Sequence, residues 1–368
     1  MIRHKLEWVQ ALRGIAALMV VVSHARYYLI GTPWQAFAER YMQPGAQGVD
    51  LFFLVSGFIM VYTTTRSDGS MRYTADFLAR RFARIWPVYA AMSLINLALQ
   101  AVWAPHLSSL GDVAKSLAFL PITTNNPPQF DLPIPVGWTL NFEFYFYLVF
   151  GLSLLAGRFR WAAFFGWMIA TLVLLPMVLT GAVSMYADHD YAIGIGYIDQ
   201  NVNPVIWDFV AGTAIGLLYI SRIQIRNTAL LAALVAASLA LVCTWSFTGI
   251  AAFHGLAHHG MTQWGLPLSI LFAALALAFK NKEPRVPRAL VWLGGVSYSL
   301  YLLHLWIFGA ADHLMDYLGY ERATHTLVFV LMVIPVPLIY AGISRRYLED
   351  GLAVFVRKKL LGLIGRRG

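Results

Sequence analysis

Two ionisable residues, Arg13 and His24, interrupt an apolar segment near the start of the chain, LRGIAALMVVVSHARYY at residues 11–27. They are eleven positions apart, which is about three helical turns, so both side chains project from one helix face roughly 16 Å apart. Histidine can act as a general base near neutral pH, and arginine binds phosphate or polarises a carbonyl group. The pair therefore predicts a site where His24 accepts a proton and Arg13 holds or polarises the reaction partner.

Other apolar segments also carry ionisable residues: Asp50 in GVDLFFLVSGF, Glu143 in GWTLNFEFYFYL and His304 in GGVSYSLYLLH. A charge at membrane depth costs about 2.5 to 3.5 kcal/mol on insertion scales and usually faces a polar cavity. At about 1.5 Å per residue, His24, Glu143 and His304 lie at a common depth in the outer half of the membrane. A histidine beside a carboxylate can take a proton from a sugar hydroxyl. We therefore predict His24, Glu143 and Arg13 as catalytic residues.

A pair of arginines, Arg81 and Arg84 in FLARRFARIWPVY, lies one helical turn apart, a spacing that suits bidentate phosphate binding. They precede an apolar segment, so we expect them at its cytoplasmic mouth, where ordinary topology-setting arginines are the alternative interpretation. Together with Arg13 they would bind a phosphorylated donor. Coenzyme A fits, because its phosphates could stay at the arginines while the extended pantetheine arm carries an acyl group inward.

Membrane-spanning helices are the elements that must position these residues. Of the 368 residues, 59% are hydrophobic and 12% are charged, whereas soluble domains carry about 25% charged residues. Segments long enough to cross about 30 Å of hydrocarbon predict an all-α polytopic membrane protein, a bundle of about ten transmembrane helices. Residues 1–350 would form one transmembrane domain and residues 351–368 a basic cytoplasmic tail. We place the spans at 9–30, 48–65, 85–104, 137–157, 161–181, 204–220, 228–250, 263–280, 289–310 and 324–344.

Basic residues set the orientation, because Lys and Arg concentrate in cytoplasmic loops. With a cytoplasmic N-terminus, 22 of the 27 Lys and Arg residues fall inside, Arg13 lies within the first span, and four lie outside. Ten spans return the C-terminus to the cytoplasm. The net charge of +9 is explained by this topology, so we expect membrane lipids and no nucleic acid as partners.

The sequence carries no P-loop, no dinucleotide-binding glycine motif and no transporter-type internal repeat. Its single cysteine, Cys243, rules out an intrachain disulfide. His254, His258 and His259 have no carboxylate or cysteine nearby in the sequence and no regular ligand spacing, so no metal is predicted.

Five motifs, in order along essentially the whole chain, resemble the membrane-bound acyltransferase family 3. They are the Arg-x10-His pattern of Arg13 and His24, GVDLFFLVSGF at 48–58, the arginine pair of RRFARIWPVY, GWTLNFEFYFYL at 137–148 and GGVSYSLYLLH at 294–304. The fourth is similar to the exopolysaccharide O-acetyltransferase branch. The resemblance implies a ten-helix domain in the bacterial cytoplasmic (inner) membrane, acetyl-CoA as donor, and importance of Arg13, His24 and the paired arginines.

The function implied by the resemblance is acetyl transfer from cytoplasmic acetyl-CoA to a hydroxyl of an extracytoplasmic polysaccharide or lipid-linked glycan precursor. Longer family members append an extracytoplasmic esterase-like domain that does not follow here. We therefore expect the membrane domain and its outer loops to capture the acceptor. For Asp50, an N-terminal helix cap is the alternative role. The predicted substrate-binding residues are Asp50, Trp138, Asn141, Tyr298 and His304.

Three alternatives stay open on the sequence. A transporter or exporter would use the same polar spans as a permeation path, although no duplicated halves are found. The same acyl transfer could act on a small secreted metabolite. Transfer could also pass through an acyl-enzyme on Ser23 or Ser56 instead of going directly from donor to acceptor. The oligomeric state and the length of the acyl group are not predicted.

The topology can be tested with cysteines introduced at positions 125, 190, 69 and 283. We expect the first two to react with a membrane-impermeant thiol reagent added outside intact cells, because the Lys and Arg distribution places them in outer loops. The last two should react only after permeabilisation. Labelling is read as a mass shift in a Cys243→Ser background. Reversed labelling at either pair would show that the orientation is inverted.

Overall fold

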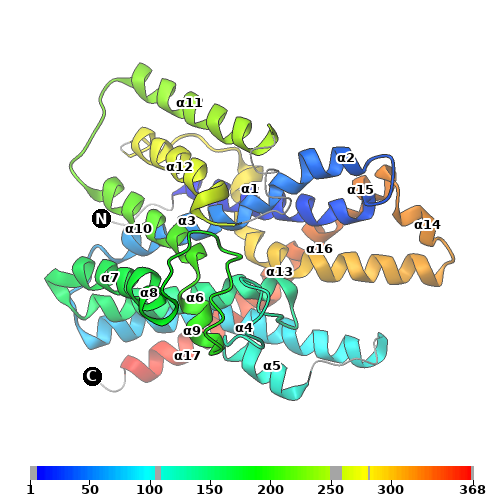
Figure 1. The fold of residues 1–368 in the computed structure, drawn as a ribbon, viewed down its shortest axis with the longest axis horizontal. Helices are drawn as coiled ribbons and strands as arrows, with labels where there is room; N and C mark the ends of the chain where they lie inside the picture. The colour runs from blue at the N-terminus through cyan, green and yellow to red at the C-terminus, as the bar shows by residue number, and fades with distance from the viewer. Residues whose placement is uncertain (1–5, 104–108, 249–258, 281, 366–368) are drawn as a thin grey trace. The chain divides into compact units, whose positions relative to one another are not determined.

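The computed structural model describes residues 6–103, 109–248, 259–280 and 282–365, and every regular element in these ranges is helical (Figure 1). The predicted all-α class is therefore confirmed. The chain divides into two compact units. The first unit comprises Met1–Phe58 and Ala211–Arg345, and the second comprises Ile59–Val210 and Arg346–Gly368. Two of the three histidines considered above for a metal site, His254 and His258, lie outside the described residues.

The first unit contains the helix that carries Arg13 and His24 and the helix that carries His304. Two helices, α3 and α10, continue across the boundaries between the units. The elements are α1 (Glu7–Ala25), a 3-10 turn (Arg26–Leu29), α2 (Gln35–Phe37), α3 (Gly48–Thr64), α10 (Trp207–Ile220), α11 (Thr228–Phe247), α12 (Leu266–Ala278), α13 (Arg288–Tyr317), α14 (Glu321–Thr324), α15 (Leu327–Val333) and α16 (Val336–Ser344).

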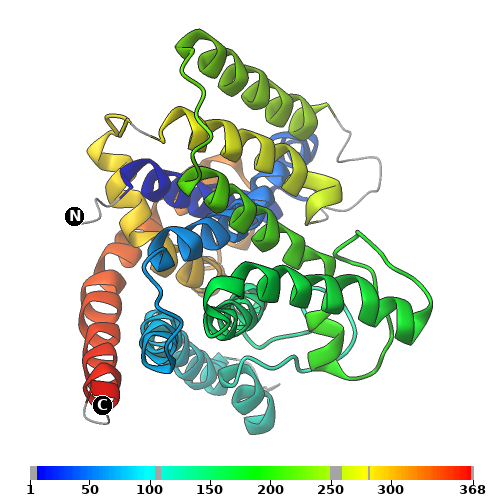
Figure 2. The ribbon, with the colours of Figure 1, turned by 90° about the vertical axis from the view of Figure 1, so that its left-hand side faces the viewer.

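The second unit contains the helices of the arginine pair and of Glu143. Its last helix, α17, is red in Figure 2 and packs against α4, so the described part of the predicted tail is helical. A nine-residue π-helical segment, Arg345–Ala353, leads into it. The elements are α4 (Met71–Trp103), α5 (Leu110–Leu117), α6 (Trp138–Leu154), α7 (Arg160–Ile169), α8 (Leu175–Thr180), α9 (Gly196–Asn201) and α17 (Val354–Gly365).

Eight helical stretches of the described chain are long and apolar enough to cross a membrane. They coincide with eight of the predicted spans, and the chain is a multi-pass membrane protein. The other two predicted spans correspond to α4, which begins fourteen residues before position 85, and to α6, which has 17 residues. A total of ten spans and cytoplasmic termini stay predictions.

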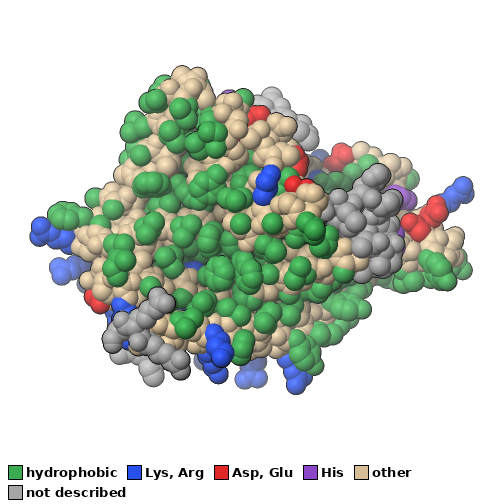
Figure 3. Space-filling view, turned by 90° about the horizontal axis from the view of Figure 1, so that it is seen from below, with side chains coloured by type: hydrophobic (Ala, Val, Ile, Leu, Met, Phe, Trp, Pro, Cys, Tyr) green, Lys and Arg blue, Asp and Glu red, His purple; other side chains and the backbone are tan. Residues whose placement is uncertain are grey.

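Burial differs widely among the eight candidate spans of the described chain. Within the apolar window of the stretch Thr228–Phe247, 11% of the residues are buried, against 22% in Gly157–Thr180 and 72% in Gln35–Thr64, which carries Asp50. Figure 3 shows hydrophobic side chains over much of one face of the molecule. Such exposure suits lipid as the surrounding medium, because lipid tails are as apolar as the side chains. The two weakly buried stretches are thus candidates for contact with lipid, whereas Met261–Ala278, which also lacks charged residues, is 50% buried.

Helices α1 and α13 pack closely and run parallel. Contacts advance together along both helices, from Arg13 with Ser297 to His24 with His304 and Tyr28 with Phe308. Glycines permit this approach: a Cβ on Gly14 would lie 2.5 Å from the backbone nitrogen of Gly294, and a Cβ on Gly294 would lie 1.8 Å from the Gln10 carbonyl oxygen. The first glycine of the GG pair in the 294–304 motif, Gly294, therefore allows α13 to pack closely against α1.

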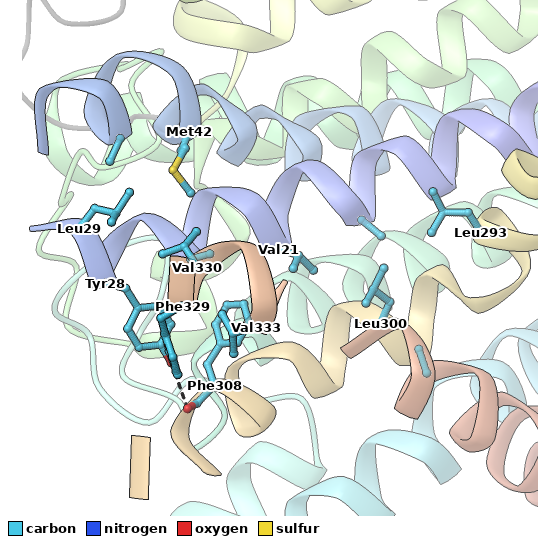
Figure 4. Close-up of a cluster of buried hydrophobic side chains, with 14 of the residues drawn as sticks. Val21, Tyr28, Leu29, Met42, Leu293, Leu300, Phe308, Phe329, Val330 and Val333 are labelled. Carbon is cyan, nitrogen blue, oxygen red and sulfur yellow. Dashed lines mark hydrogen bonds between the residues drawn. The ribbon is translucent and has the colours of Figure 1, made fainter. Parts of the chain in front are cut away.

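An apolar cluster extends the contact beyond the two helices. Val21 and Leu300 belong to it together with Phe329, Val330 and Val333 of α15 (Figure 4). The hydroxyl of Tyr28 donates to the Phe308 carbonyl oxygen at 3.0 Å inside the same cluster. Packing of this kind fixes the rotation of α1 about its axis. It therefore fixes where His24 points.

A glycine substitution tests this packing. Gly294→Ala places a methyl group against the α1 backbone, and overpacking of a tight contact costs about 1–3 kcal/mol. Gly309→Ala, on the same helix, is the matched control, because a Cβ at that position would have no atom within 4 Å and alanine favours helix by about 1 kcal/mol. We expect a lower unfolding temperature in detergent for the first variant only. Equal stability of both variants would contradict the close packing of α1 and α13.

Candidate active site

The structure brings His24 and His304 into direct contact. His24 Nδ1 and His304 Nε2 are 3.1 Å apart, and the ring centroids are 4.9 Å apart. The contact agrees with the prediction that these two histidines lie at one level, while their depth in the membrane stays a prediction. Neither helix alone would place them together, since 280 residues separate them in the chain. The parallel packing of α1 and α13 does so.

Hydrogen-bond partners assign the tautomers of the pair. His304 Nδ1 lies 3.3 Å from the Leu300 carbonyl oxygen, so it carries the proton and leaves Nε2 as an acceptor. His24 Nδ1 lies 3.0 Å from the Val20 carbonyl oxygen and faces that acceptor, so it also carries its proton. Neutral His24 then has its lone pair on Nε2. This is the nitrogen that can accept a proton from a substrate.

The two histidines differ in how far their side chains are buried. The His304 side chain is fully buried, whereas His24 is partly exposed. A substrate can therefore reach His24, and His304 lies behind it. The 3-10 turn Arg26–Leu29 follows α1 directly, and its Tyr27 packs near the His24 imidazole at 6.3 Å between ring centroids.

Arg13 lies three turns before His24 on α1. Its Nη2 donates to Ser297 Oγ at 3.1 Å, and Ser297 Oγ donates to the Gly294 carbonyl oxygen at 3.0 Å. Arg13 is only partly buried, while Ser297 is fully buried. The guanidinium is thus anchored at one end of its fork to α13, and its distance along the helix from His24 agrees with the prediction.

A second group of predicted residues meets in the second unit. Glu143 accepts a hydrogen bond from the Tyr147 hydroxyl, one turn further along α6. The Arg81 guanidinium carbon lies 5.6 Å from the centre of the Tyr147 ring, and its Nη2 donates to Thr63 Oγ1 at 3.1 Å. The charges of Glu143 and Arg84 both act on Arg81. Arg84 itself is exposed.

This cluster brings Arg81 closer to Glu143 than the sequence predicted, while the membrane depths of both residues stay predictions. From the sequence, the arginines were expected at a cytoplasmic mouth and the carboxylate about two-thirds of the way across the membrane. Helix α4 already begins at Met71, so Arg81 lies ten residues inside it, and Tyr147 reaches back along α6 from Glu143. Glu143 and His24 belong to different units, and their predicted cooperation stays a prediction.

Asp50 has partners that the sequence did not indicate. Its carboxylate is fully buried and accepts hydrogen bonds from His259 Nδ1 at 2.8 Å and from the Gly260 amide at 2.6 Å. The argument that no carboxylate lies near this histidine is therefore wrong in space, although it holds along the chain. These bonds fasten the segment before α12 to the first turn of α3. They are tertiary bonds to a distant segment and not a cap of α3, so they give Asp50 a structural partner, while contact with substrate stays a prediction.

The other predicted substrate-binding residues lie in both units. Trp138 and Asn141 are buried at the start of α6, and Oδ1 of Asn141 has no hydrogen-bond partner among the described residues. Tyr298 is partly buried on α13, in the same helix as His304. Sequence reasoning missed Tyr147, Ser297 and His259. The YFY run and the serines of the α13 motif were the available signals for the first two, but nothing in the sequence linked His259 to Asp50.

Known proteins agree with the class of membrane enzyme that this arrangement indicates. A family model described as "Acyltransferase domain" matches residues 6–342. The chain belongs to this acyltransferase family, which covers both units, and it is a non-aminoacyl acyltransferase. No solved structure matches the chain.

Individual relatives support the same assignment. The chain is 32% identical over 264 residues to exopolysaccharide production protein ExoZ of Rhizobium meliloti (strain 1021), covering 71% of this chain and 75% of that protein. It is 29% identical over 203 residues to the O-acetyl transferase of Shigella phage Sf6, covering 52% and 57%. It is 25% identical over 311 residues to nodulation protein 10 of Rhizobium leguminosarum bv. viciae, covering 80% of each.

The role of Asp50 can be tested by two substitutions. Asp50→Ala leaves the buried Gly260 amide without its acceptor, which costs about 1–3 kcal/mol. Asp50→Asn keeps an acceptor for that amide, so we expect it to retain most of the stability. Thermal unfolding in detergent measures the difference. An Asp50→Ala protein as stable as the parent, but with weakened acceptor binding, would instead assign Asp50 to the substrate.

Proposed function

We propose that the protein transfers an acetyl group from acetyl-CoA on the cytoplasmic side of a bacterial inner membrane to a hydroxyl of an extracytoplasmic polysaccharide or lipid-linked glycan precursor. The observation that carries the proposal is the His24–His304 pair, which leaves Nε2 of a partly exposed histidine as the base. The names of the ExoZ and phage relatives support exopolysaccharide and O-acetyl transfer as the chemistry.

Direct transfer needs one base and no covalent enzyme intermediate. His24 Nε2 takes the proton of the acceptor hydroxyl as its oxygen attacks the thioester carbonyl carbon. The tetrahedral intermediate then expels the coenzyme A thiolate. The protonated His24 returns its proton to the sulfur, giving the ester and free coenzyme A. Its Nδ1–H remains bonded to Val20 and His304 throughout, which keeps the ring oriented.

Ser23 is poorly placed as a nucleophile, which supports direct transfer. It is buried, its hydroxyl donates to the Gln43 carbonyl oxygen at 3.2 Å, and it accepts a hydrogen bond from Arg26 at 3.1 Å. The proton of Ser23 is thus directed at a backbone acceptor and not at a base. A nucleophilic serine needs the opposite arrangement.

Arginines would hold the donor. Arg84 is exposed and one turn from Arg81, whose own guanidinium contacts Thr63 and two aromatic rings. We assign Arg84 as the main phosphate ligand of that pair and Arg81 as the residue that supports it. Arg13, on the helix of the base, would position the acyl arm or polarise the thioester carbonyl.

Turnover by purified protein in nanodiscs tests the base. His24→Ala should lower coenzyme A release by about 10² to 10⁴-fold while donor binding persists, because general base catalysis is worth about that much. His304→Ala should lose less, and His304→Gln should recover part of that loss, because the amide oxygen can accept from His24 Nδ1. Exposed His313 on the same helix provides the control His313→Ala.

Two further results decide between the alternatives. Near-normal transfer by a folded His24→Ala protein would refute the assignment of the base. If Glu143 acts with His24, the double variant His24→Ala with Glu143→Gln should be scarcely slower than His24→Ala alone. A transporter, by contrast, would move substrate across liposomes without releasing coenzyme A from acetyl-CoA.

A further inference from the structure

A cavity lies in the first unit, at the end where the parallel helices α1 and α13 both begin. Its volume is about 670 Å³, which is within the range of about 300–1,000 Å³ that is usual for small-ligand sites. No residue of the predicted site lines it. The lining residues are Glu7, Arg285, Val286, Arg288, Val291, Trp292 and Arg345.

Basic side chains predominate among the charged residues that line this cavity. Three guanidinium groups line it against one carboxylate. The ion pairs found in the described part of the chain include neither Arg285 nor Arg288. The first amide of α1, that of Glu7, already donates to Glu283 at 2.7 Å, so the side chains of Arg285 and Arg288, and not this helix end, are the donors that a ligand would meet. Arginine forks bind phosphate in a planar, bidentate way.

The fold holds one lining side chain in place, that of Arg345, and leaves another, Trp292, half exposed. A Cβ on Gly295 would lie 2.2 Å from Nη1 of Arg345, so the guanidinium packs directly on the α13 backbone. Ser344, the residue before it, bonds Ser299 of α13 at 3.0 Å between the hydroxyl oxygens. Trp292 is 48% exposed and offers an indole face at the same cavity. The second glycine of the GGVSYSLYLLH motif thus makes room for a basic side chain of this cavity.

We propose that this cavity binds the phosphate groups of a phosphorylated ligand, the nucleotide end of the coenzyme A donor. The headgroup of an anionic phospholipid is the other ligand that would present the same chemistry. The choice of coenzyme A rests on the proposed function. Coenzyme A carries a diphosphate and a separate ribose phosphate, so one arginine pair does not account for all its charges. Its adenine ring would have Trp292 as a stacking partner.

Basic residues that only set topology would look different. They need no shared cavity, no aromatic lining and no glycine that admits a guanidinium. Arg222 and Arg226, in the exposed segment between α10 and α11, do not line this cavity and serve as the comparison.

The test measures coenzyme A affinity of the full-length protein in phosphatidylcholine nanodiscs. We expect Arg285→Ala with Arg288→Ala to weaken binding about a hundredfold, about tenfold for each guanidinium lost. Arg222→Ala with Arg226→Ala should leave affinity unchanged. Dephospho-coenzyme A should bind the parent more weakly if the ribose phosphate occupies the cavity, and Trp292→Ala should weaken binding of the adenine-containing donor.

A second arm identifies the lipid source. Native mass spectrometry of protein exchanged into phosphatidylglycerol measures retained lipid; loss of retained lipid in the Arg285 and Arg288 variant, with unchanged coenzyme A affinity, would assign the cavity to a phospholipid headgroup. If that variant alters neither coenzyme A affinity nor retained lipid, the proposal is overturned. Parent protein that binds coenzyme A but shows no acetyl transfer would instead refute the proposed function and leave the cavity assignment standing.

Discussion

The parallel contact between α1 and α13 is the constraint on which the candidate active site depends. A Cβ at Gly294 would come within 1.8 Å of the Gln10 carbonyl oxygen, so the two backbones approach as closely as a glycine allows. In a lipid medium, helices gain little from burying apolar surface, and association depends on close packing and interhelical hydrogen bonds. The glycine contact at one end and the histidine contact at 3.1 Å further along therefore reinforce one another.

The register of this contact assigns each polar residue a partner. A shift of one residue along α13 would rotate His304 by about 100° away from His24 and would also remove Ser297 from Arg13. The apolar cluster of Val21, Leu300 and Phe329 resists such a shift, because its side chains interlock between three helices. Apolar packing around α1 thus keeps its polar side chains in position. The position of the proposed base therefore depends on both helices, and the Arg-x10-His pattern alone does not determine it.

Much of this arrangement could be predicted from the sequence, because periodicity and depth along a helix are local properties. His24 and His304 were expected at one level, since each lies a similar number of residues from its helix start. Pairings between distant segments were not predictable. Nothing local indicates that His259 bonds Asp50, 209 residues away. The contact of Arg81 with Tyr147 was not predicted, because α4 extends beyond its apolar part and hydropathy marks only the apolar part.

Arginines that maintain structure have partners that offset their positive charge, whereas arginines that bind a ligand keep a charge for that ligand to offset. Arg81 lies between the rings of Phe77 and Tyr147 and feels the opposite charge of Glu143. A partly buried guanidinium needs such partners, because removing it from water is costly. Arg84 is exposed beside Arg81 and carries the same positive charge. A phosphate group bound there would neutralise that charge. The same reasoning applies to the cavity of the first unit, where one carboxylate faces three guanidiniums. Several guanidiniums gathered at one cavity favour an anionic partner, because arginine forks bind phosphate groups.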